Sequence, residues 1–320
     1  MKQSPPDHGG GIDAAIQEFG GARGDWLDLS TGINPVSYPL PKLTQDDWAA
    51  LPDAQAMACL LTAARKFWKV PPDADIIAAP GASAIIARIP YLLEPGAVDI
   101  QTRTYNEHAG AFMHAGWQVS NQHARAKVVV HPNNPDGALW QGQETHSDDH
   151  ELLVIDESFC DIAPEKSFVS NHLTRNTIVL KSFGKFWGLA GVRLGFAIGH
   201  FDRIDGMRNM LGPWPVAGPA LRIGATALGD LNWANSTRER LTRDANRLDK
   251  LMLVIPGVTQ ASGTSLFRLY DTKDATAFRT RLARAHILTR SFPYSKSWLR
   301  LGLPGSDTDW ARLETALEVV

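Results

Sequence analysis

The residues best suited to chemistry lie in one stretch, from Thr177 to Gly199. It opens with an apolar, β-branched run that predicts a buried strand, and Ser182 and Lys185 follow directly. A glycine-punctuated segment comes next and holds one basic residue, Arg193. A lysine beside glycines at the end of a buried strand can have a lowered pKa, and its amine then forms a Schiff base with an aldehyde. Ser182 and Arg193 offer donors for a phosphate, Arg193 through its planar guanidinium.

The alternative for Lys185 is an ordinary surface lysine, but the spacing around it is specific. Ser-x-x-Lys is followed by Gly-Leu-x-Gly-x-Arg-x-Gly-Phe, with Arg193 eight residues after Lys185. This string closely resembles the lysine loop of fold-type I pyridoxal phosphate (PLP) enzymes. Within them it is most similar to the branch of histidinol-phosphate aminotransferases and threonine-phosphate decarboxylases. The resemblance implies that Lys185 carries PLP as cofactor and that Ser182 and Arg193 bind its phosphate.

A second phosphate-binding element is predicted at Gly81, Ala82 and Ser83, between a predicted strand and a predicted helix. Free backbone N–H groups and the helix dipole favour a phosphate at a helix start, and the Ser83 hydroxyl adds a donor. The alternative is that Ser83 only caps the helix. The position resembles the Gly-Ala-Ser phosphate cup of the family. Tyr105, at the start of a helix predicted over 107–115, resembles the aromatic residue that stacks on the cofactor ring.

Two further polar side chains come at the ends of predicted strands. Asp156 ends the apolar run that begins at Leu152, and open α/β sheets bind ligands at the carboxyl ends of their strands. A single aspartate there often only caps a turn. The resemblance implies instead that Asp156 pairs with the pyridinium nitrogen and keeps the ring electron-poor. Asn134, directly before Pro135 in a turn rich in Asn, Pro and Gly, matches the residue that hydrogen-bonds the cofactor's phenolic oxygen.

The amino-terminal segment narrows the resemblance further. His8-Gly9-Gly10 precedes the string Leu-Asp-Leu-Ser-Thr-Gly-Ile-Asn-Pro, which contains Asn34. Together they resemble the opening of threonine-phosphate decarboxylases of cobalamin biosynthesis. Histidinol-phosphate aminotransferases share the Asn-Pro turn and generally lack the arm. The resemblance implies that His8 and Asn34 bind substrate, whereas a lone histidine in such an arm would otherwise have no predicted role.

Three arginines lie in predicted strands of the carboxyl-terminal third, where arginine is more often an edge or surface residue. Arg300, in Trp-Leu-Arg-Leu-Gly, resembles the family's carboxylate-binding arginine. Arg290, at the end of the preceding predicted strand, resembles the arginine that faces a substrate phosphate. Arg268 is interpreted as structural.

Two positions depart from the family pattern. Many aminotransferases of this fold have a tyrosine where this chain has Phe159, and its hydroxyl bonds the phenolic oxygen of PLP. Relatives also commonly have Tyr-Pro where this chain has Leu51-Pro52, and that tyrosine reaches the neighbouring subunit's cofactor phosphate. What replaces the two hydroxyls is left open by the sequence.

Composition excludes several classes of function. The 320 residues are 44% apolar and 21% charged, as in soluble globular proteins. A net charge of −2 without a long basic run argues against a nucleic-acid partner. The amino terminus has no signal-like apolar core, and no stretch reaches membrane-spanning length. Cys59 and Cys160 are too few for a disulfide framework. These features predict a cytoplasmic protein with no membrane partner, and no metal site is predicted.

The predicted fold class is α/β, the fold-type I PLP-dependent transferase fold, with a mostly parallel seven-stranded sheet and a smaller α+β domain. The predicted domains are an arm and part of the small domain over 1–34, the large PLP-binding domain over 35–215, and the rest of the small domain over 216–320. A single long helix is predicted over about 220–253, because heavy charge follows one face of that stretch.

The resemblance implies a PLP-dependent lyase, a homodimer that decarboxylates L-threonine O-3-phosphate to (R)-1-amino-2-propanol O-phosphate in cobalamin biosynthesis. The first alternative is an aminotransferase that acts on histidinol phosphate or a related amino acid, because it would use the same residues. A second alternative is a PLP-binding protein without catalysis. The arm that contains His8 and the presence of Phe159 favour decarboxylation, although the motifs report the cofactor better than the bond that breaks.

Overall fold

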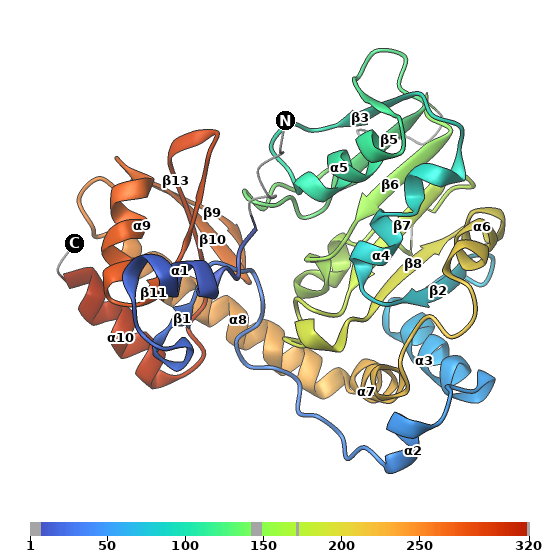
Figure 1. The fold of residues 1–320 in the computed structure, drawn as a ribbon, viewed down its shortest axis with the longest axis horizontal. Helices are drawn as coiled ribbons and strands as arrows, with labels where there is room; N and C mark the ends of the chain where they lie inside the picture. Colours follow the sequence, from blue (N-terminus) through green and yellow to red (C-terminus); the bar gives the residue numbers. More distant parts are fainter. Residues whose placement is uncertain (1–7, 142–148, 171–172, 319–320) are drawn as a thin grey trace. The chain divides into compact units, whose positions relative to one another are not determined.

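The apolar runs in the middle of the chain pair into a seven-stranded sheet. The computed structural model describes residues 8–141, 149–170 and 173–318. In spatial order the strands are β2 (Asp75–Ala79), β8 (Gly195–Gly199), β7 (Thr177–Ser182), β6 (Leu152–Asp156), β5 (Ala126–Val130), β3 (Ala97–Ile100) and β4 (Gln118–Val119). β8 is antiparallel to both of its neighbours, and the other pairs are parallel (Figure 1). The predicted mostly parallel sheet is thereby confirmed.

The central strands are buried along their whole length, which explains why their sequences are continuously apolar. All five residues of β6 are buried. Helices α4 (Ala82–Ile86), α5 (Asn106–His114) and α6 (Phe201–Leu211) contribute Ile85, Phe112 and Ile204 to one core with the strands. This packing fixes the carboxyl ends of the strands, from which the candidate site is built.

The helix predicted over about 220–253 is two helices, α7 (Gly218–Gly229) and α8 (Leu231–Met252). The break falls at Asp230, whose carboxylate accepts a hydrogen bond from the Trp233 backbone N–H at 2.9 Å. An aspartate that satisfies a free N–H of the first turn starts a new helix. The prediction of a single helix was wrong, because the charge pattern of α8 gives no sign of this local cap.

α7 packs closely on α3 (Ala54–Phe67). A Cβ at Gly224 would lie 2.7 Å from Leu60 Cδ1 and 2.6 Å from Leu194 Cδ2, so glycine permits the close approach. A short helix, α2 (Gln45–Ala49), precedes α3. The compact unit that holds the large sheet comprises 37–134 and 138–236. It therefore includes α7 and extends beyond the domain end predicted at residue 215.

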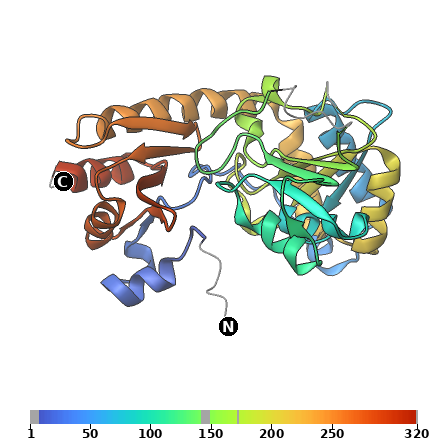
Figure 2. The same ribbon diagram turned by 90° about the horizontal axis from the view of Figure 1, so that it is seen from above.

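The second unit comprises 1–36, 135–137 and 237–320, of which the described residues start at 8. A four-stranded antiparallel sheet is its centre, in the order β12 (Arg290–Phe292), β13 (Ser295–Gly302), β10 (Phe267–Asp271) and β9 (Gln260–Thr264). β1 (Leu27–Asp28) pairs in parallel with β11 (Ile287–Leu288). The unit also contains the helices α1 (Ile12–Phe19), α9 (Ala275–Arg284) and α10 (Asp307–Glu318) and the part of α8 from Thr237 onward. α1 packs beside α9 (Figure 1 and Figure 2).

No helix within the described part of the chain is both long enough and apolar enough to cross a membrane.

Candidate active site

A cavity of about 110 Å³ lies at the carboxyl ends of β5, β6 and β7. Of the nine residues predicted to bind PLP, Gly81 alone is not part of its lining, and the other eight are Ala82, Ser83, Tyr105, Asn134, Asp156, Ser182, Lys185 and Arg193. They come from five separate segments of the large unit, and parallel strands bring such segments to one edge. The fold therefore gathers these side chains, and their binding of PLP stays a prediction.

Asp156 is the buried anion of the cavity, with 2% of its surface exposed. Its Oδ2 lies 2.8 Å from His108 Nε2, and its Oδ1 accepts hydrogen bonds from the Ser158 hydroxyl and from the Ser158 N–H at 2.9 Å. Burial alone would raise the pKa of this carboxyl, but the hydrogen bonds from His108 and Ser158 lower it below its ordinary value of 3.8. Asp156 is therefore held as a carboxylate.

His108 is a functional candidate that the sequence interpretation missed. It is completely buried on α5, and its ring packs edge-on to Tyr105 at a centroid distance of 6.0 Å. Its Nδ1 has no hydrogen-bond partner among the described residues, so Nε2 makes its one polar contact, with Asp156. The available signal was spacing, because His108 lies three residues after Tyr105 and so on the same helix face.

The backbone of Gly81 and Ala82 lies tightly against two parts of the lysine loop. A Cβ built on Gly81 would lie 2.5 Å from Arg193 Nη2, and one built on Gly195 would lie 2.3 Å from the Ala82 nitrogen. Gly81 also has φ +84°, a conformation that glycine adopts without strain. The guanidinium of Arg193 is therefore held against the start of α4, and Ser83, in the first turn of that helix, lines the same cavity.

Lys185 follows β7 in the loop and is half-buried. Its Nζ lies 5.4 Å from the ring centroid of Phe159, a buried residue that also lines the cavity. The aromatic face therefore contacts the amine where a tyrosine would bring a hydroxyl. Phe159 therefore offers the amine no hydroxyl group, as a tyrosine would, and contributes a cation–π contact in its place.

The turn that contains Asn134 is tied to the segment before Tyr105. Asn133 is completely buried, its Oδ1 accepts from Thr104 Oγ1 at 2.6 Å, and its Nδ2 donates to the Arg103 carbonyl at 3.0 Å. These two bonds connect the loops that carry Asn134 and Tyr105 into the same cavity. Asn133 was not singled out from the sequence, because turns rich in Asn and Pro occur on many protein surfaces.

The four residues predicted to bind substrate all belong to the second unit. The arm that contains His8 is seated on Ser30, whose hydroxyl accepts from the Gly10 N–H at 2.7 Å. A Cβ on Gly9 would lie 2.4 Å from the Ser30 carbonyl oxygen. That same carbonyl accepts from Arg300 Nη2 at 2.7 Å. His8 itself is exposed.

Arg290 and Arg300 are cross-strand partners on β12 and β13. Their guanidinium carbons lie 5.2 and 6.0 Å from the ring centroid of Phe292. Two arginines at directly opposed positions of neighbouring strands favour an anionic ligand, because an anion offsets the repulsion between like charges. Arg268, interpreted as structural, instead forms a salt bridge with Asp249 at 2.8 Å.

Asn34 is also buried, and sequence reasoning missed the residue that orients it. Its Oδ1 accepts from Arg240 Nη2 and from the Val36 N–H at 3.1 Å. Arg240 lies on α8 and is held in turn by Asp244 at 2.9 Å. No sequence signal connects positions 34 and 240, which are 206 residues apart.

Comparison with known proteins assigns the class to which this fold and cavity belong. Residues 25–320 match the family described as aminotransferase class I and II. Because the match covers most of the chain, the protein belongs to this family.

Within the family, the chain is similar to two curated threonine-phosphate decarboxylases. It is 37% identical to that of Pseudomonas aeruginosa, over 97% of each chain, and 36% identical to that of a Sinorhizobium species, over 98% of each. The crystal structure of histidinol-phosphate aminotransferase from Sinorhizobium meliloti in complex with pyridoxal-5'-phosphate superposes with a TM-score of 0.79. It covers 99% of this chain and 97% of that one at 17% identity. This likeness establishes the fold, and the predicted fold class is confirmed.

Proposed function

We propose that this protein decarboxylates L-threonine O-3-phosphate to (R)-1-amino-2-propanol O-phosphate, a step of cobalamin biosynthesis, with PLP as its cofactor. The observation that carries the proposal is the identity of 36–37% to two threonine-phosphate decarboxylases over almost the whole length of each chain. The arm with His8, Gly9 and Gly10, seated on Ser30, supports the same assignment.

The side chains of the cavity fit PLP. Lys185 offers an amine for its aldehyde, Asp156 an ionised carboxylate for its ring nitrogen, and Arg193 a guanidinium for its phosphate. The backbone at Gly81 leaves no room for a Cβ beside that guanidinium. When bound, PLP supplies a ring that accepts the electrons of a bond broken at the substrate's α-carbon.

Each residue has a definite role in this proposal. Asp156, kept ionised by His108 and Ser158, holds a proton on the ring nitrogen. Tyr105 stacks on the ring, and Asn134 donates a hydrogen bond to the phenolic oxygen. Arg193, Ser182 and Ser83 bind the cofactor phosphate. Lys185 would hold the aldehyde until the substrate's amine displaces it, and its freed Nζ would then be available to donate the proton that replaces the lost carboxylate at the α-carbon.

The substrate carries a carboxylate and a phosphate, so its site requires two cationic clamps. We assign the carboxylate to Arg300 with Asn34, and the phosphate to Arg290 with His8. The closeness of the two guanidinium groups to Phe292 supports a site for a substrate with more than one negative charge. Arg240 keeps the amide of Asn34 oriented.

An aminotransferase is the second candidate, because the family and the Sinorhizobium meliloti structure both carry that activity in their names. The two reactions differ in the bond at the α-carbon that breaks. The experiment is product analysis after incubation of the PLP-loaded protein with L-threonine O-3-phosphate, with and without 2-oxoglutarate. We expect carbon dioxide and aminopropanol phosphate in equal amounts, independent of 2-oxoglutarate. Formation of a keto acid that requires 2-oxoglutarate would replace the decarboxylase assignment by the aminotransferase.

We also propose that the protein acts as a homodimer in the cytoplasm. Leu51 and Trp214 are 69% and 58% exposed, beside cavities that share Pro52 and Asp53. Exposed apolar surface of this kind is typical of protein interfaces. The free cysteines Cys59 and Cys160 are consistent with a reducing compartment.

A further inference from the structure

A buried ion-pair cluster lies directly behind the candidate active site in the large unit. Lys181 Nζ is 2.5 Å from Glu157 Oε2 and 3.5 Å from Asp161 Oδ1. The three side chains are 1%, 0% and 5% exposed. Consecutive residues of a strand point to opposite faces. Because Ser182 lines the cavity, Lys181 points away from it, and none of the three lines the cavity.

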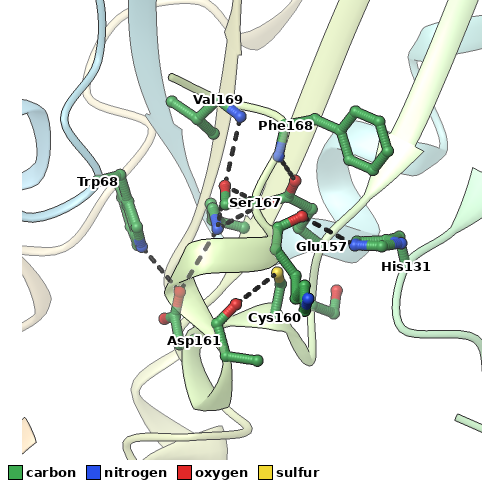
Figure 3. A network of polar contacts seen from close by, with 12 residues as sticks. Trp68, His131, Glu157, Cys160, Asp161, Ser167, Phe168 and Val169 are labelled. Atoms are coloured by element: carbon green, nitrogen blue, oxygen red, sulfur yellow. Dashed lines mark hydrogen bonds and ion pairs between the residues drawn. The ribbon is translucent and has the colours of Figure 1, made fainter. Parts of the chain in front are cut away.

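Each carboxylate of the cluster has further partners, as Figure 3 shows. Glu157 accepts hydrogen bonds from the Ser167 hydroxyl and the Phe168 N–H, both at 2.6 Å. Asp161 accepts from Trp68 Nε1 at 2.8 Å. Hydrogen bonds from several segments therefore fix the orientation of both carboxylates. Apolar packing, which is not directional, would not fix the orientation of these side chains.

Lys181 carries the positive charge of the cluster at neutral pH. Burial alone would lower the pKa of Lys181, but the carboxylates of Glu157 and Asp161 outweigh it and raise that pKa above its ordinary value of 10.5. An ion pair this deeply buried is weak evidence for stability, because apolar residues of the same volume often stabilise a fold equally well. Stability alone therefore does not explain why this ion pair is present, and its position between two strand ends has to be considered.

The two strands that the cluster joins carry the reactive groups. Glu157 directly follows Asp156, and Lys181 directly precedes Ser182 in the strand that leads to Lys185. The backbone connection at this point includes the Glu157 N–H donating to the Leu180 carbonyl at 3.0 Å. A slip of either strand end would move Asp156 relative to the loop that carries Lys185.

We propose that Lys181 and Glu157 are positioning residues, which hold the ends of β6 and β7 so that Asp156 and the Lys185 loop keep the spacing that PLP requires. The inference rests on the proposed use of PLP. It goes beyond that function, because it assigns a role in cofactor binding to residues that do not touch the cavity.

The experiment compares stability with cofactor affinity in the full-length protein. K181M leaves two buried carboxylates, Glu157 and Asp161, without their cation. K181M/E157Q leaves only the Asp161 carboxylate, which keeps its hydrogen bond from Trp68 Nε1, and it keeps an amide oxygen for the Phe168 N–H. Urea unfolding of the PLP-free protein measures stability, and titration with PLP followed by visible absorbance measures affinity. We expect the double variant to recover part of the stability that K181M loses, because one uncompensated carboxylate remains in place of two. We expect its Kd for PLP to stay at least about tenfold above that of the wild type, with an altered absorbance spectrum.

Two further variants make the outcome decisive. E157D keeps the charge but retracts the carboxylate by one methylene from its buried partners, and we expect PLP binding to weaken by more than the accompanying loss of stability accounts for. K127M breaks the partly exposed pair of Lys127 and Asp99 at 3.5 Å between other strands of the same sheet, and we expect an unchanged Kd. The proposal is overturned if PLP affinity simply follows stability across the series, or if E157D and the double variant bind PLP as the wild type does. A wild-type protein that binds no PLP would instead refute the proposed function.

Discussion

At the residue scale, burial and hydrogen bonding act in opposite directions on the pKa of Asp156. Burial disfavours its charge, and the contacts from His108 and Ser158 restore it. A carboxyl whose pKa is lower in the folded than in the unfolded protein stabilises the fold at pH values above its unfolded-state pKa. This stabilisation is lost as the pH falls through the folded-state pKa. For Asp156 that window lies below its ordinary value of 3.8.

His108→Phe should therefore produce a pH-dependent stability defect. The variant loses the hydrogen bond to Asp156, so the folded pKa of the carboxyl rises, and we expect a deficit of about 1–3 kcal/mol at neutral pH. The deficit should shrink as the pH is lowered to about 3, because the wild type then loses the contribution of the ionised carboxylate. Urea unfolding of the PLP-free protein at several pH values measures this. His114→Phe, on the exposed end of the same helix, is the control, and a deficit independent of pH would contradict the assignment.

At the scale of an element, the start of α4 requires glycine at position 81, because there is no room for a Cβ. In Gly81→Ala the new methyl group would meet Arg193 Nη2, and the residue would be strained at φ +84°. We expect the Kd for PLP to rise at least about tenfold, since the guanidinium must move from the phosphate. Absorbance titration with PLP measures it. Gly110→Ala, inside α5 with nothing within 4 Å, should instead add about 0.5–1 kcal/mol of stability. Equal affinities for Gly81→Ala and wild type would exclude Arg193 as a phosphate ligand.

The pairing of β12 with β13 places Arg290 opposite Arg300, and from this we predict an effect of Arg290 on substrate choice. Arg290→Ala removes one of two neighbouring guanidinium groups. We expect kcat/KM for L-threonine O-3-phosphate to fall about tenfold to a hundredfold, because a charged hydrogen bond contributes about 1.5–3 kcal/mol. Unphosphorylated threonine, which cannot make this contact, should lose much less. Steady-state kinetics on both substrates tests this, with Arg268→Ala as a structural control. An equal loss for both substrates would assign Arg290 a structural role.

At the scale of the whole molecule, the proposed homodimer has a specific test. Introducing glutamates at Leu51 and Trp214 places charge on exposed apolar surface, and burial of an unpaired charge opposes association. We expect the double variant to be monomeric at micromolar concentration by light scattering, while the wild type is a dimer. Val254→Glu, at an apolar position that is even more exposed, at 79%, should leave the dimer intact. A wild type that is monomeric would rule out the dimer itself.

The lysine loop was predictable because its information is local. Ser182, Lys185 and Arg193 lie within 12 consecutive residues, and the structure brings all three to the lining of one cavity. The buried strands were predictable for a related reason, since a strand covered on both faces is apolar throughout. Gly81, Ala82 and Ser83 could be placed at a strand–helix junction for the same cause, although the sequence did not reveal how little space Arg193 leaves there.

The tertiary structure alone decided which distant side chains support these residues. His108 and Asp156 are 48 positions apart, and Arg240 and Asn34 are 206 apart. Such contacts arise where a helix packs on a strand or on a loop, and no periodicity along the chain encodes them. The same holds for Lys181, which reads as the polar end of a strand but is completely enclosed. Its burial depends on side chains that converge from separate segments, so only the folded chain reveals the charge cluster behind the site.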